Sequence, residues 1–556
     1  MTPSGVVTWP DERAASYRAL GHWRGRAIGS LVTSWADCYG SDVAVVDERR
    51  SLTYLDLAAE VDVLAERLLG LGLRSGDSIV VQLPNCAEFI VLMLACTRVG
   101  VVPTMMLTAH REQELTHIAR HVAAKAVVVP DRVHDYDHQA LARRVASTCG
   151  GVKHVLVAGD HVEPGNVDLR ALVRPDAETW ERRRRLDALA PDPSSTALFL
   201  LSGGTTGVPK VIPRTHNDYE YGARHSARVC GFDRSTAYLV ALPAAHTFPL
   251  GSPGLLGTLM NGGRVVVVSS PRPEVAFEAI ATHRVTVAAA VPAVVQRWLE
   301  SSESAEWDLS SLRLLQVGGS RLSRELALRV EPALGCALQQ VYGMSEGLLN
   351  FTRLDDPIEV VVATQGRPMS AADEIRVVDE HGRQVEDGEA GELLVRGPTT
   401  IPGYFRVPEH NAECFTVDGW YRTGDVVRRH PSGNLVVESR VKDVINRGGE
   451  KIHAEEVEDV LNRMPQIARA AAVAAPHREL GEVVCACVVL RDGRTLTLEE
   501  VREVFAASGL AAFKFPERLE VVDEMPLTPV GKIRKQRLRE LAAGVRSARQ
   551  VEEVGA

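Results

Sequence analysis

Short apolar runs alternate with amphipathic segments along most of the chain. Leu57, Val61, Leu64 and Leu68 repeat at helical spacing, and the apolar run at 78–83 then predicts a buried strand. Further strands are expected at 126–129, 154–158, 264–268, 285–290 and 312–317, with a helix at 275–283. Strands separated by helices favour parallel sheets, so the pattern predicts an α/β fold.

The pattern changes towards the C-terminus. Short strands such as 391–396, separated by glycine and charged turns, predict a β-rich subdomain. Helices at 454–464 and 498–507, with strands between them, predict a small α+β domain. We therefore expect a large domain, 1–440, made of two α/β subdomains and the β-rich subdomain, followed by a small mobile domain, 441–556.

Length, charge and cysteine content narrow the class of protein. A chain of 556 residues is too long for a single core. Its net charge of −9 argues against a nucleic-acid partner, and polar residues interrupt every long apolar segment, which argues against a membrane span. The N-terminus shows no targeting pattern, so we expect a cytoplasmic protein. Among nine scattered cysteines only Cys485 and Cys487 lie close together, which argues against structural zinc and a disulfide framework.

The most informative segment follows a predicted apolar strand at 197–201. It consists of small or hydroxylated residues and one lysine, namely Ser202, Gly203, Gly204, Thr205, Thr206, Gly207 and Lys210. Glycines let the backbone approach a ligand, hydroxyl groups donate hydrogen bonds and the lysine supplies positive charge, so the segment predicts a phosphate-binding loop. The common mononucleotide loop has glycine directly before its lysine, whereas this chain has Pro209. The alternative is a flexible surface turn.

A second motif occupies 342–347. Tyr342 offers a flat face on which a purine can stack, and Gly343 allows close approach of the backbone. Glu346 provides a carboxylate for Mg²⁺, which prefers oxygen ligands and usually takes one or two from a protein. The alternative is a tight turn that exposes a glutamate.

Three further segments carry weaker signals. Asp425 ends a loop and can accept hydrogen bonds from both hydroxyl groups of a ribose. The charged segment 440–451 contains a glycine pair at the expected domain boundary and predicts a hinge, or else a solvated turn. Lys532 lies on a loop rich in proline and glycine, from which it reaches an active site only if the small domain closes over the large one.

Taken in order, these motifs resemble the adenylate-forming superfamily, which includes acyl- and aryl-CoA synthetases, luciferases and the adenylation domains of nonribosomal peptide synthesis. The likeness covers about residues 30–540. Within the superfamily the segments 202–207, 212–216, 342–348 and 446–451 look like those of the stand-alone aryl acid–AMP ligases, which activate 2,3-dihydroxybenzoate or salicylate.

The resemblance implies a two-step ligase that requires ATP and Mg²⁺. A carboxylate attacks the α-phosphate of ATP to give an acyl adenylate and pyrophosphate, and a thiol then displaces AMP. By carry-over, 202–210 holds the β- and γ-phosphates, Tyr342 stacks on adenine and Glu346 binds Mg²⁺. The remaining ATP-binding and hinge positions are Gly319, Gly343, Asp425 and Arg440 for ATP, and Lys442 for the hinge. Lys532 contacts the α-phosphate and the carboxylate in the first step only.

The resemblance also implies a binding site for an aromatic acid. The expected contacts are His246, Thr247, Phe248, Gly251, Ser252, Gly318, Val341 and Leu348. His246 is expected to shape the pocket or gate the path to ATP, or else to pack as a bonded core imidazole. Other members have asparagine where this chain has Thr247, and Ser252 matches the serine typical of dihydroxybenzoate enzymes.

The exchange of asparagine for threonine bears on the identity of the acid. Threonine is shorter and lacks the amide, so the pocket gains volume and loses a donor. We therefore expect a substituted or larger aromatic acid, such as an alkylated hydroxybenzoate, a hydroxyanthranilate or a bicyclic hydroxy-aryl acid. The alternative is that Thr247 merely tolerates the usual substrate.

The sequence is compatible with two acyl acceptors. No phosphopantetheine-type segment follows Lys532, so we expect an external carrier protein of a secondary-metabolite pathway, such as siderophore or antibiotic biosynthesis, with free coenzyme A as the alternative. A catalytically dead homologue is disfavoured because Glu346, Asp425, Arg440 and Lys532 are all present.

Overall fold

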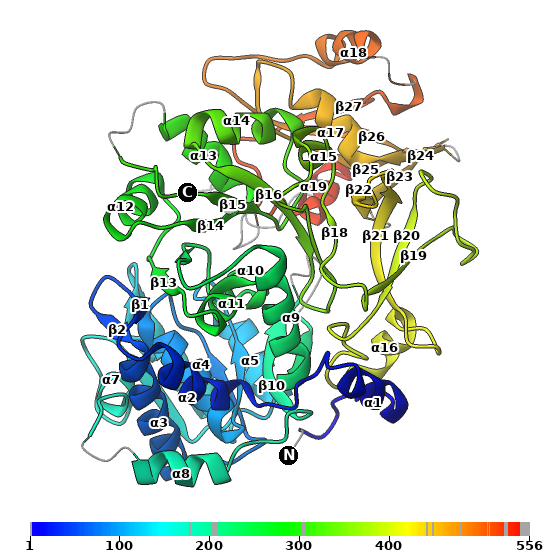
Figure 1. Ribbon diagram of the computed structural model, residues 1–556. Coiled ribbons are helices and arrows are strands. Elements are labelled where there is room, and N and C mark those ends of the chain that lie inside the picture. The colour runs from blue at the N-terminus through cyan, green and yellow to red at the C-terminus, as the bar shows by residue number, and fades with distance from the viewer. Residues whose placement is uncertain are drawn as a thin grey trace. The chain divides into compact units, whose positions relative to one another are not determined.

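A computed structural model describes residues 3–176, 180–202, 209–302, 307–440, 443–447, 450–477, 480–508, 510, 512–527 and 532–544. These residues form two compact units (Figure 1). The first contains the described residues up to Ile375 together with Val395–Tyr421, and the second contains Arg376–Leu394 and the described residues from Arg422 onwards. No helix in the described ranges has the length and apolar character needed to cross a membrane.

The first unit contains a seven-stranded sheet. Its order is β11 (Val211–Thr215), β10 (Thr196–Leu201), β4 (Val102–Met105), β3 (Ser78–Val81), β5 (Ala126–Pro130), β8 (His154–Ala158) and β9 (Val167–Asp168). All neighbours are parallel except β10 and β11, which form an antiparallel pair. The strands predicted at 78–83, 126–129 and 154–158 are thus confirmed.

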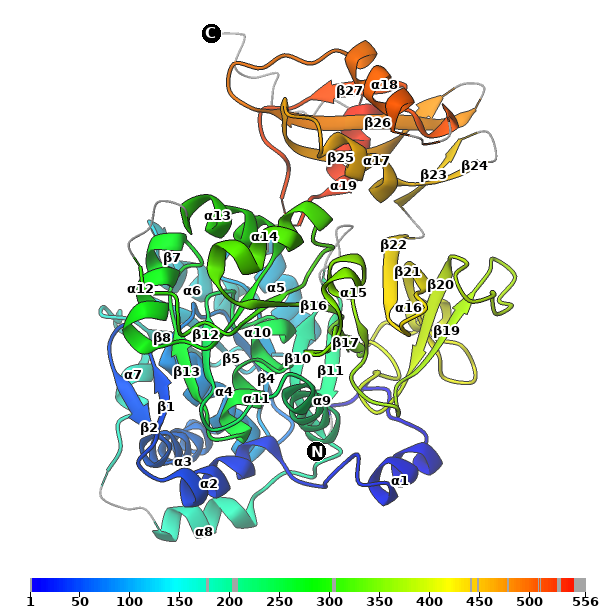
Figure 2. The same cartoon turned by 45° about the horizontal axis from the view of Figure 1, so that its top comes forward.

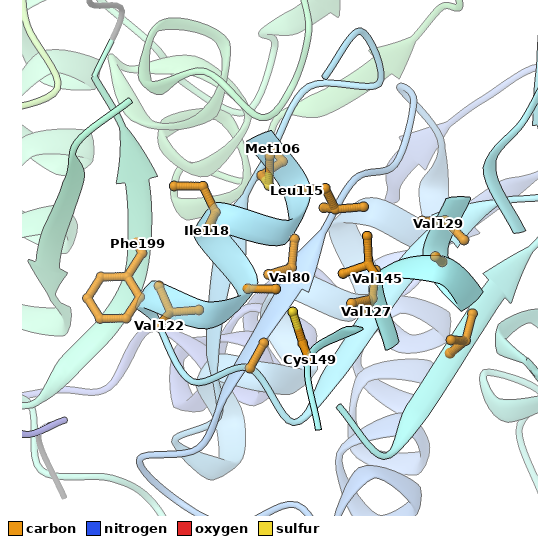
Figure 3. Close-up of a cluster of buried hydrophobic side chains, with 14 of the residues drawn as sticks. Val80, Met106, Leu115, Ile118, Val122, Val127, Val129, Val145, Cys149 and Phe199 are labelled. Atoms are coloured by element: carbon orange, nitrogen blue, oxygen red, sulfur yellow. The ribbon is translucent and has the colours of Figure 1, made fainter. Parts of the chain in front are cut away.

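Helices pack their apolar faces onto this sheet. Among them are α4 (Ala87–Val99), α5 (Glu112–His121) and α6 (His138–Thr148), whereas α3 (Tyr54–Gly70) packs against α4. Figure 3 shows Leu115 and Ile118 of α5 and Val145 of α6 beside Val80 and Val127 of the sheet. These side chains are almost fully buried, and each buried aliphatic side chain contributes about 1.5–3 kcal/mol through transfer from water.

The second sheet of the first unit has nine strands. Its order is β18 (Arg367–Pro368), β17 (Leu349–Phe351), β16 (Ala337–Gly343), β15 (Leu314–Val317), β14 (Val287–Ala290), β12 (Ala237–Val240), β13 (Arg264–Val267), β1 (Val43–Val46) and β2 (Ser51–Thr53). The strands predicted at 264–268, 285–290 and 312–317 are confirmed, and so is the helix, which is α12 (Pro273–His283). In this sheet the last two strands, β1 and β2, come from the N-terminal part of the chain, and β1 pairs in parallel with β13, with Val45 opposite Val265.

The second unit carries most of a small sheet and all of the C-terminal α+β part. The small sheet has the order β19 (Glu374–Val378), β20 (Gly391–Arg396), β21 (Tyr421–Arg429) and β22 (Leu435–Arg440). The C-terminal sheet contains β24 (Glu450–His453), β23 (Val444–Arg447), β26 (Gly481–Leu490), β25 (Ile467–His477) and β27 (Arg518–Val521). The predicted β-rich segment and the α+β segment are confirmed.

Helices cover both faces of the C-terminal sheet (Figure 2). α17 (Ala454–Leu461) and α18 (Leu498–Ala507) pack on one face, and α19 (Lys535–Ala542) packs on the other. Cys485 and Cys487 of β26 both face α19, as the alternation of side chains along a strand requires. The boundary after residue 440 stays a prediction, and the proposed hinge Lys442 lies outside the described residues.

Candidate active site

The predicted phosphate loop leaves the end of β10 and returns at the start of β11. At its base the Ser202 amide donates to the Lys210 carbonyl at 2.9 Å, and the Lys210 amide donates to Ser202 Oγ at 3.0 Å. The next pair in register is Leu201 with Val211, so the two strands continue the same ladder. Both ends of the loop are therefore fixed to the sheet. Five predicted loop residues lie outside the described ranges, namely Gly203, Gly204, Thr205, Thr206 and Gly207.

Tyr342 and Gly343 end β16 and lead into a tight turn. The Met344 amide donates to the Leu348 carbonyl at 3.2 Å, after which the chain returns as β17. Tyr342 lies opposite Asn350 in this antiparallel pair and is half-buried, whereas Gly343 is exposed. An exposed turn beside a half-buried aromatic ring suits the predicted adenine contact. Leu348, expected at the acid, is buried beneath the turn.

Glu346 lies in the same turn, and a buried hydroxyl group holds its carboxylate. Tyr404 donates its hydroxyl to Glu346 Oε1 at 2.8 Å, and the hydroxyl groups of Tyr404 and Tyr421 are 2.9 Å apart. Burial raises the pKa of Tyr404, and the nearby Glu346 charge raises it further. The donor is therefore neutral and places no positive charge beside the carboxylate.

The donor set fits Mg²⁺ bound together with a polyphosphate. Within the described residues no three His, Cys, Asp or Glu side chains gather at one point that could hold a metal. Mg²⁺ commonly needs only one or two protein carboxylates and takes its other oxygens from phosphates and water. The single carboxylate of Glu346 is enough to meet that requirement. Lys210 is also close enough that its charge, second to burial, lowers the pKa of His410.

Arg214 ties the phosphate loop strand to the Glu346 turn, a role that sequence reasoning missed. It lies in β11 and pairs with Asp218 of α9 (His216–Val229) at 2.6 Å, and both side chains are buried. Its guanidinium also donates to the Ser345 carbonyl at 2.7 Å and to the Thr399 carbonyl at 3.2 Å. Asp218 completes a capping box with Thr215 at the start of α9, and this Thr-x-x-Asp pattern is the one local signal in the sequence.

The predicted acid motif forms the start of α10 (Thr247–Gly251). His246 precedes the helix, and His246, Thr247 and Phe248 are all partly exposed. A Cβ atom placed on Gly318 would lie 3.2 Å from Phe248 Cε1 and 3.3 Å from Val341 Cβ. The structure therefore brings Phe248, Gly318 and Val341 together at the ends of β15 and β16. Gly319 follows as an exposed residue.

Thr247 and Gly251 face Tyr219, a residue that sequence reasoning did not identify. Tyr219 of α9 places its hydroxyl 3.4 Å from Thr247 Oγ1. A Cβ atom on Gly251 would lie 2.8 Å from Tyr219 Cζ. The Tyr219 ring therefore fills the space beside Gly251, and the gain in pocket volume expected from Thr247 stays a prediction.

Three predicted residues belong to the second unit. Asp425 of β21 lies opposite Arg440 of β22, and Arg440 Nε is 2.8 Å from Asp425 Oδ1. The carboxylate is buried and the arginine is exposed, so the pair presents its charges at one edge of the small sheet. Lys532 is exposed, beside the bridge that joins Leu527 to Ile533.

A surface cavity of about 790 Å³ lies elsewhere in the first unit. It is lined by side chains such as Glu112, His117 and Arg120, and none of the predicted site residues lines it. The site is therefore defined by its chemistry rather than by that cavity.

Comparison with known proteins gives matches along nearly the whole chain. Residues 32–405 match the family described as AMP-binding enzyme, and residues 456–532 match the AMP-binding enzyme C-terminal domain. The chain is similar to a salicylyl-CoA synthase / salicylate adenylyltransferase of Streptomyces sp, with 56% identity over 98% of this chain and 99% of the relative.

Two further relatives differ in the acid or the acceptor that they name. A 2-hydroxy-7-methoxy-5-methyl-1-naphthoate–CoA ligase of Streptomyces carzinostaticus is 52% identical over 97% of each chain. A salicyl-AMP ligase / salicyl-S-ArCP synthetase of Mycobacterium tuberculosis is 46% identical over 96% of this chain and 94% of the relative.

Proposed function

This chain belongs to the family of AMP-binding enzymes, and we propose that it activates a hydroxylated aromatic carboxylic acid with ATP and passes the aryl group to a carrier-protein thiol. The acid becomes an aryl-AMP, and the acceptor is the phosphopantetheine of an aryl or acyl carrier protein in secondary-metabolite biosynthesis. The observation that carries the proposal is the identity of 46–56% to salicylate-activating ligases over almost the entire chain.

In the first step a carboxylate oxygen forms a bond to the α-phosphorus while the bond from that phosphorus to the bridging oxygen breaks. Pyrophosphate leaves, and negative charge grows along the phosphates, so catalysis consists mainly of positioning and charge stabilisation. Lys210 and the loop that begins at Ser202 would hold the departing phosphates. Tyr342 would stack on adenine, and Asp425 with Arg440 would hold the ribose.

Mg²⁺, when bound, would neutralise the phosphate oxygens. Glu346 would hold it, and Tyr404 would keep that carboxylate in place through its 2.8 Å hydrogen bond. Lys532 would stabilise the α-phosphate and the carboxylate as the bond between them forms. In the second step the thiol attacks the acyl carbon, the bond to the phosphate oxygen breaks and AMP leaves.

The relatives also narrow the class of aromatic acid that is the substrate. Two of them name salicylate and one names a 2-hydroxy-1-naphthoate, and all of these acids carry a hydroxyl group on the carbon next to the carboxylate-bearing carbon. We infer an ortho-hydroxy aryl acid, with one or two rings, as the substrate class.

Coenzyme A is the second candidate acceptor. The two Streptomyces relatives described above include CoA in their names, whereas the Mycobacterium tuberculosis relative names S-ArCP. Either acceptor presents a phosphopantetheine thiol, so the chemistry of the second step is the same.

An exchange assay tests the proposal. ATP–pyrophosphate exchange is measured with a panel that contains salicylate, 2,3-dihydroxybenzoate, 2-hydroxy-1-naphthoate and benzoate. We expect exchange with at least one ortho-hydroxy acid, followed by AMP release on addition of a phosphopantetheinylated carrier protein. AMP release with CoA alone would favour the second candidate, and no exchange with any aryl acid would contradict the proposal.

A further inference from the structure

Two hydroxyl groups lie together at the start of α10, and a third lies at its end. Tyr219 contributes one from α9, Thr247 contributes one from the first residue of α10, and Ser252 follows the last residue of α10. The 3.4 Å between the Tyr219 and Thr247 oxygens exceeds the 2.5–3.0 Å usual for O–H···O bonds. Ser252 is 1% exposed, and its Oγ has no hydrogen-bond partner in the described part of the chain. Buried hydroxyl groups with weak or absent partners indicate that a polar group of a ligand completes their bonding.

Gly251 determines where the Tyr219 ring lies. A Cβ atom at residue 251 would be 2.8 Å from Tyr219 Cζ and 2.9 Å from its hydroxyl oxygen. Both distances are shorter than carbon atoms tolerate, so any other residue would push the ring away from Thr247. The absence of a side chain at Gly251 thus leaves space for the Tyr219 ring. Because the ring occupies that space, it is not open to a bulkier acid.

Tyr219 is a hydrogen-bond donor at any pH used for an assay. Its ring is 2% exposed, and burial raises its pKa to about 12. The Arg214 guanidinium carbon lies 5.1 Å from the ring centroid and stabilises the ring from the side of β11. The phenol therefore keeps its proton and a fixed orientation.

An ortho-hydroxy aryl acid offers the matching acceptor. Its phenolic hydrogen points at the neighbouring carboxylate, which leaves an oxygen lone pair directed outwards. A donor from the protein completes that oxygen, whereas an acid without the hydroxyl group would leave the buried phenol unpaired. Sites built to bond a substrate hydroxyl group reject analogues that lack it far more strongly than apolar pockets reject a change of size.

We propose that Tyr219 is the specificity-determining residue for the ortho-hydroxyl group of the aryl acid. Gly251 admits its ring, and Thr247 holds its hydroxyl near the acid. This inference rests on the proposed function and adds a residue from α9 to a site otherwise made by α10 and the ends of β15 and β16.

The test compares salicylate with benzoate. For Tyr219→Phe the ratio of kcat/KM for salicylate to that for benzoate, measured by pyrophosphate exchange, is expected to fall about tenfold, with the KM for ATP unchanged. Tyr221→Phe is the matched control, because Tyr221 lies on the same helix with its hydroxyl 2.6 Å from Ser370 Oγ and its pKa likewise raised by burial to about 12. We expect the control to keep the wild-type ratio.

Two further variants separate selectivity from folding. Gly251→Ala should lower the same ratio, and adding it to Tyr219→Phe should lower the ratio little further, because both changes remove one hydroxyl contact. If Tyr219→Phe fails to fold, as judged by thermal melting, Thr247→Val should still lower the ratio two- to threefold. A folded Tyr219→Phe protein with the wild-type ratio overturns the inference alone, whereas a wild-type protein that exchanges with no aryl acid overturns the proposed function and the inference with it.

Discussion

Single side chains decide how charge is arranged at the site. The Glu346 carboxylate is buried, and it accepts a hydrogen bond from the neutral hydroxyl of Tyr404, which in turn lies 2.9 Å from the hydroxyl of Tyr421. Such a chain fixes the direction of a carboxylate without neutralising it. A cation can then complete the charge balance, which an arginine in place of Tyr404 would prevent.

Tyr404→Phe tests this arrangement. We expect the Mg²⁺ concentration at half-maximal exchange to rise about tenfold, because the carboxylate loses the bond that orients it. Glu346→Gln should lower exchange by about a hundredfold, since it removes the charge itself. Both are measured by exchange across a Mg²⁺ titration. An unchanged Mg²⁺ dependence in both variants would contradict the role of Glu346.

A second residue links stability to pH. Asp373 precedes β19, and both of its carboxylate oxygens are buried. Burial raises its pKa from 3.8 to about 7. The folded protein therefore binds this proton more tightly than the unfolded chain does. The contribution of Asp373 to the free energy of unfolding is greatest below pH 3.8. It is lost as the pH rises towards 7, because the folded protein must then bury a charged carboxylate.

Asp373→Asn should remove that dependence. Relative to wild type, the variant is expected to gain about 2 kcal/mol more unfolding free energy at pH 8.5 than at pH 5.5. Urea unfolding at the two pH values measures it. Asp387→Asn serves as the control, because Asp387 is 89% exposed and should shift stability equally at both. An equal shift for Asp373→Asn would show that its carboxyl group is not perturbed in the folded protein.

At the scale of elements, Arg214 connects parts of the chain that no local pattern relates. It joins β11 to α9 through Asp218, to the Glu346 turn through Ser345, and to the segment before Tyr404 through Thr399. The phosphate loop strand and the Glu346 turn are thereby held in one framework. The local sequence around Arg214 predicts the helix cap at Asp218. It does not predict the two carbonyl groups that Arg214 bonds, because they lie more than a hundred residues further along the chain.

Arg214→Met should leave Asp218 as an unpaired buried charge. We expect the free energy of unfolding to fall by about 3–5 kcal/mol, measured by urea unfolding. The control is Arg383→Met, which breaks an exposed pair with Asp379 at the same i,i+4 spacing and should change little. Equal effects of the two substitutions would mean that the Arg214 network contributes no more than a surface pair.

Local patterns predicted most strands and helices because each of these elements carries its own apolar periodicity. The run at 78–83 and the helix at 498–507 are examples. Tyr219, Arg214 and Tyr404 were missed for a different reason. Their functional contacts depend on the packing of α9, α10 and the Glu346 turn, and nothing in the neighbouring residues of each specifies those partners. Motif order identified Asp425 and Arg440, which the structure does bring together.

At the scale of the whole molecule, the candidate residues divide between the two units. Lys210, Glu346 and Tyr342 belong to the first, whereas Asp425, Arg440 and Lys532 belong to the second. We propose that the C-terminal part alternates between the two half-reactions, with Lys532 at the site in the first only. This division of labour makes the half-reactions separable by mutation.

Lys532→Ala should lower aryl-AMP formation by at least about a hundredfold and spare thiol capture of a supplied aryl-AMP. Pyrophosphate exchange measures the first step, and AMP release from synthetic aryl-AMP measures the second. Lys514→Ala is the control, because Lys514 bonds Glu456 at 2.7 Å within the same unit and should leave both steps intact. Equal loss in both half-reactions for Lys532→Ala would contradict the alternation.

The position of β1 bears on how the chain is made. Val45 pairs with Val265, 220 residues further along the chain. At about 5–20 residues per second, a ribosome needs roughly 10–40 seconds to supply that partner. Meanwhile β1 leaves a strand edge of the nascent chain unpaired, and closing so long a loop costs roughly 5 kcal/mol before contacts offset it. The nine-stranded sheet is therefore completed late in synthesis, and the hairpin of β1 and β2 needs protection from aggregation until β13 emerges.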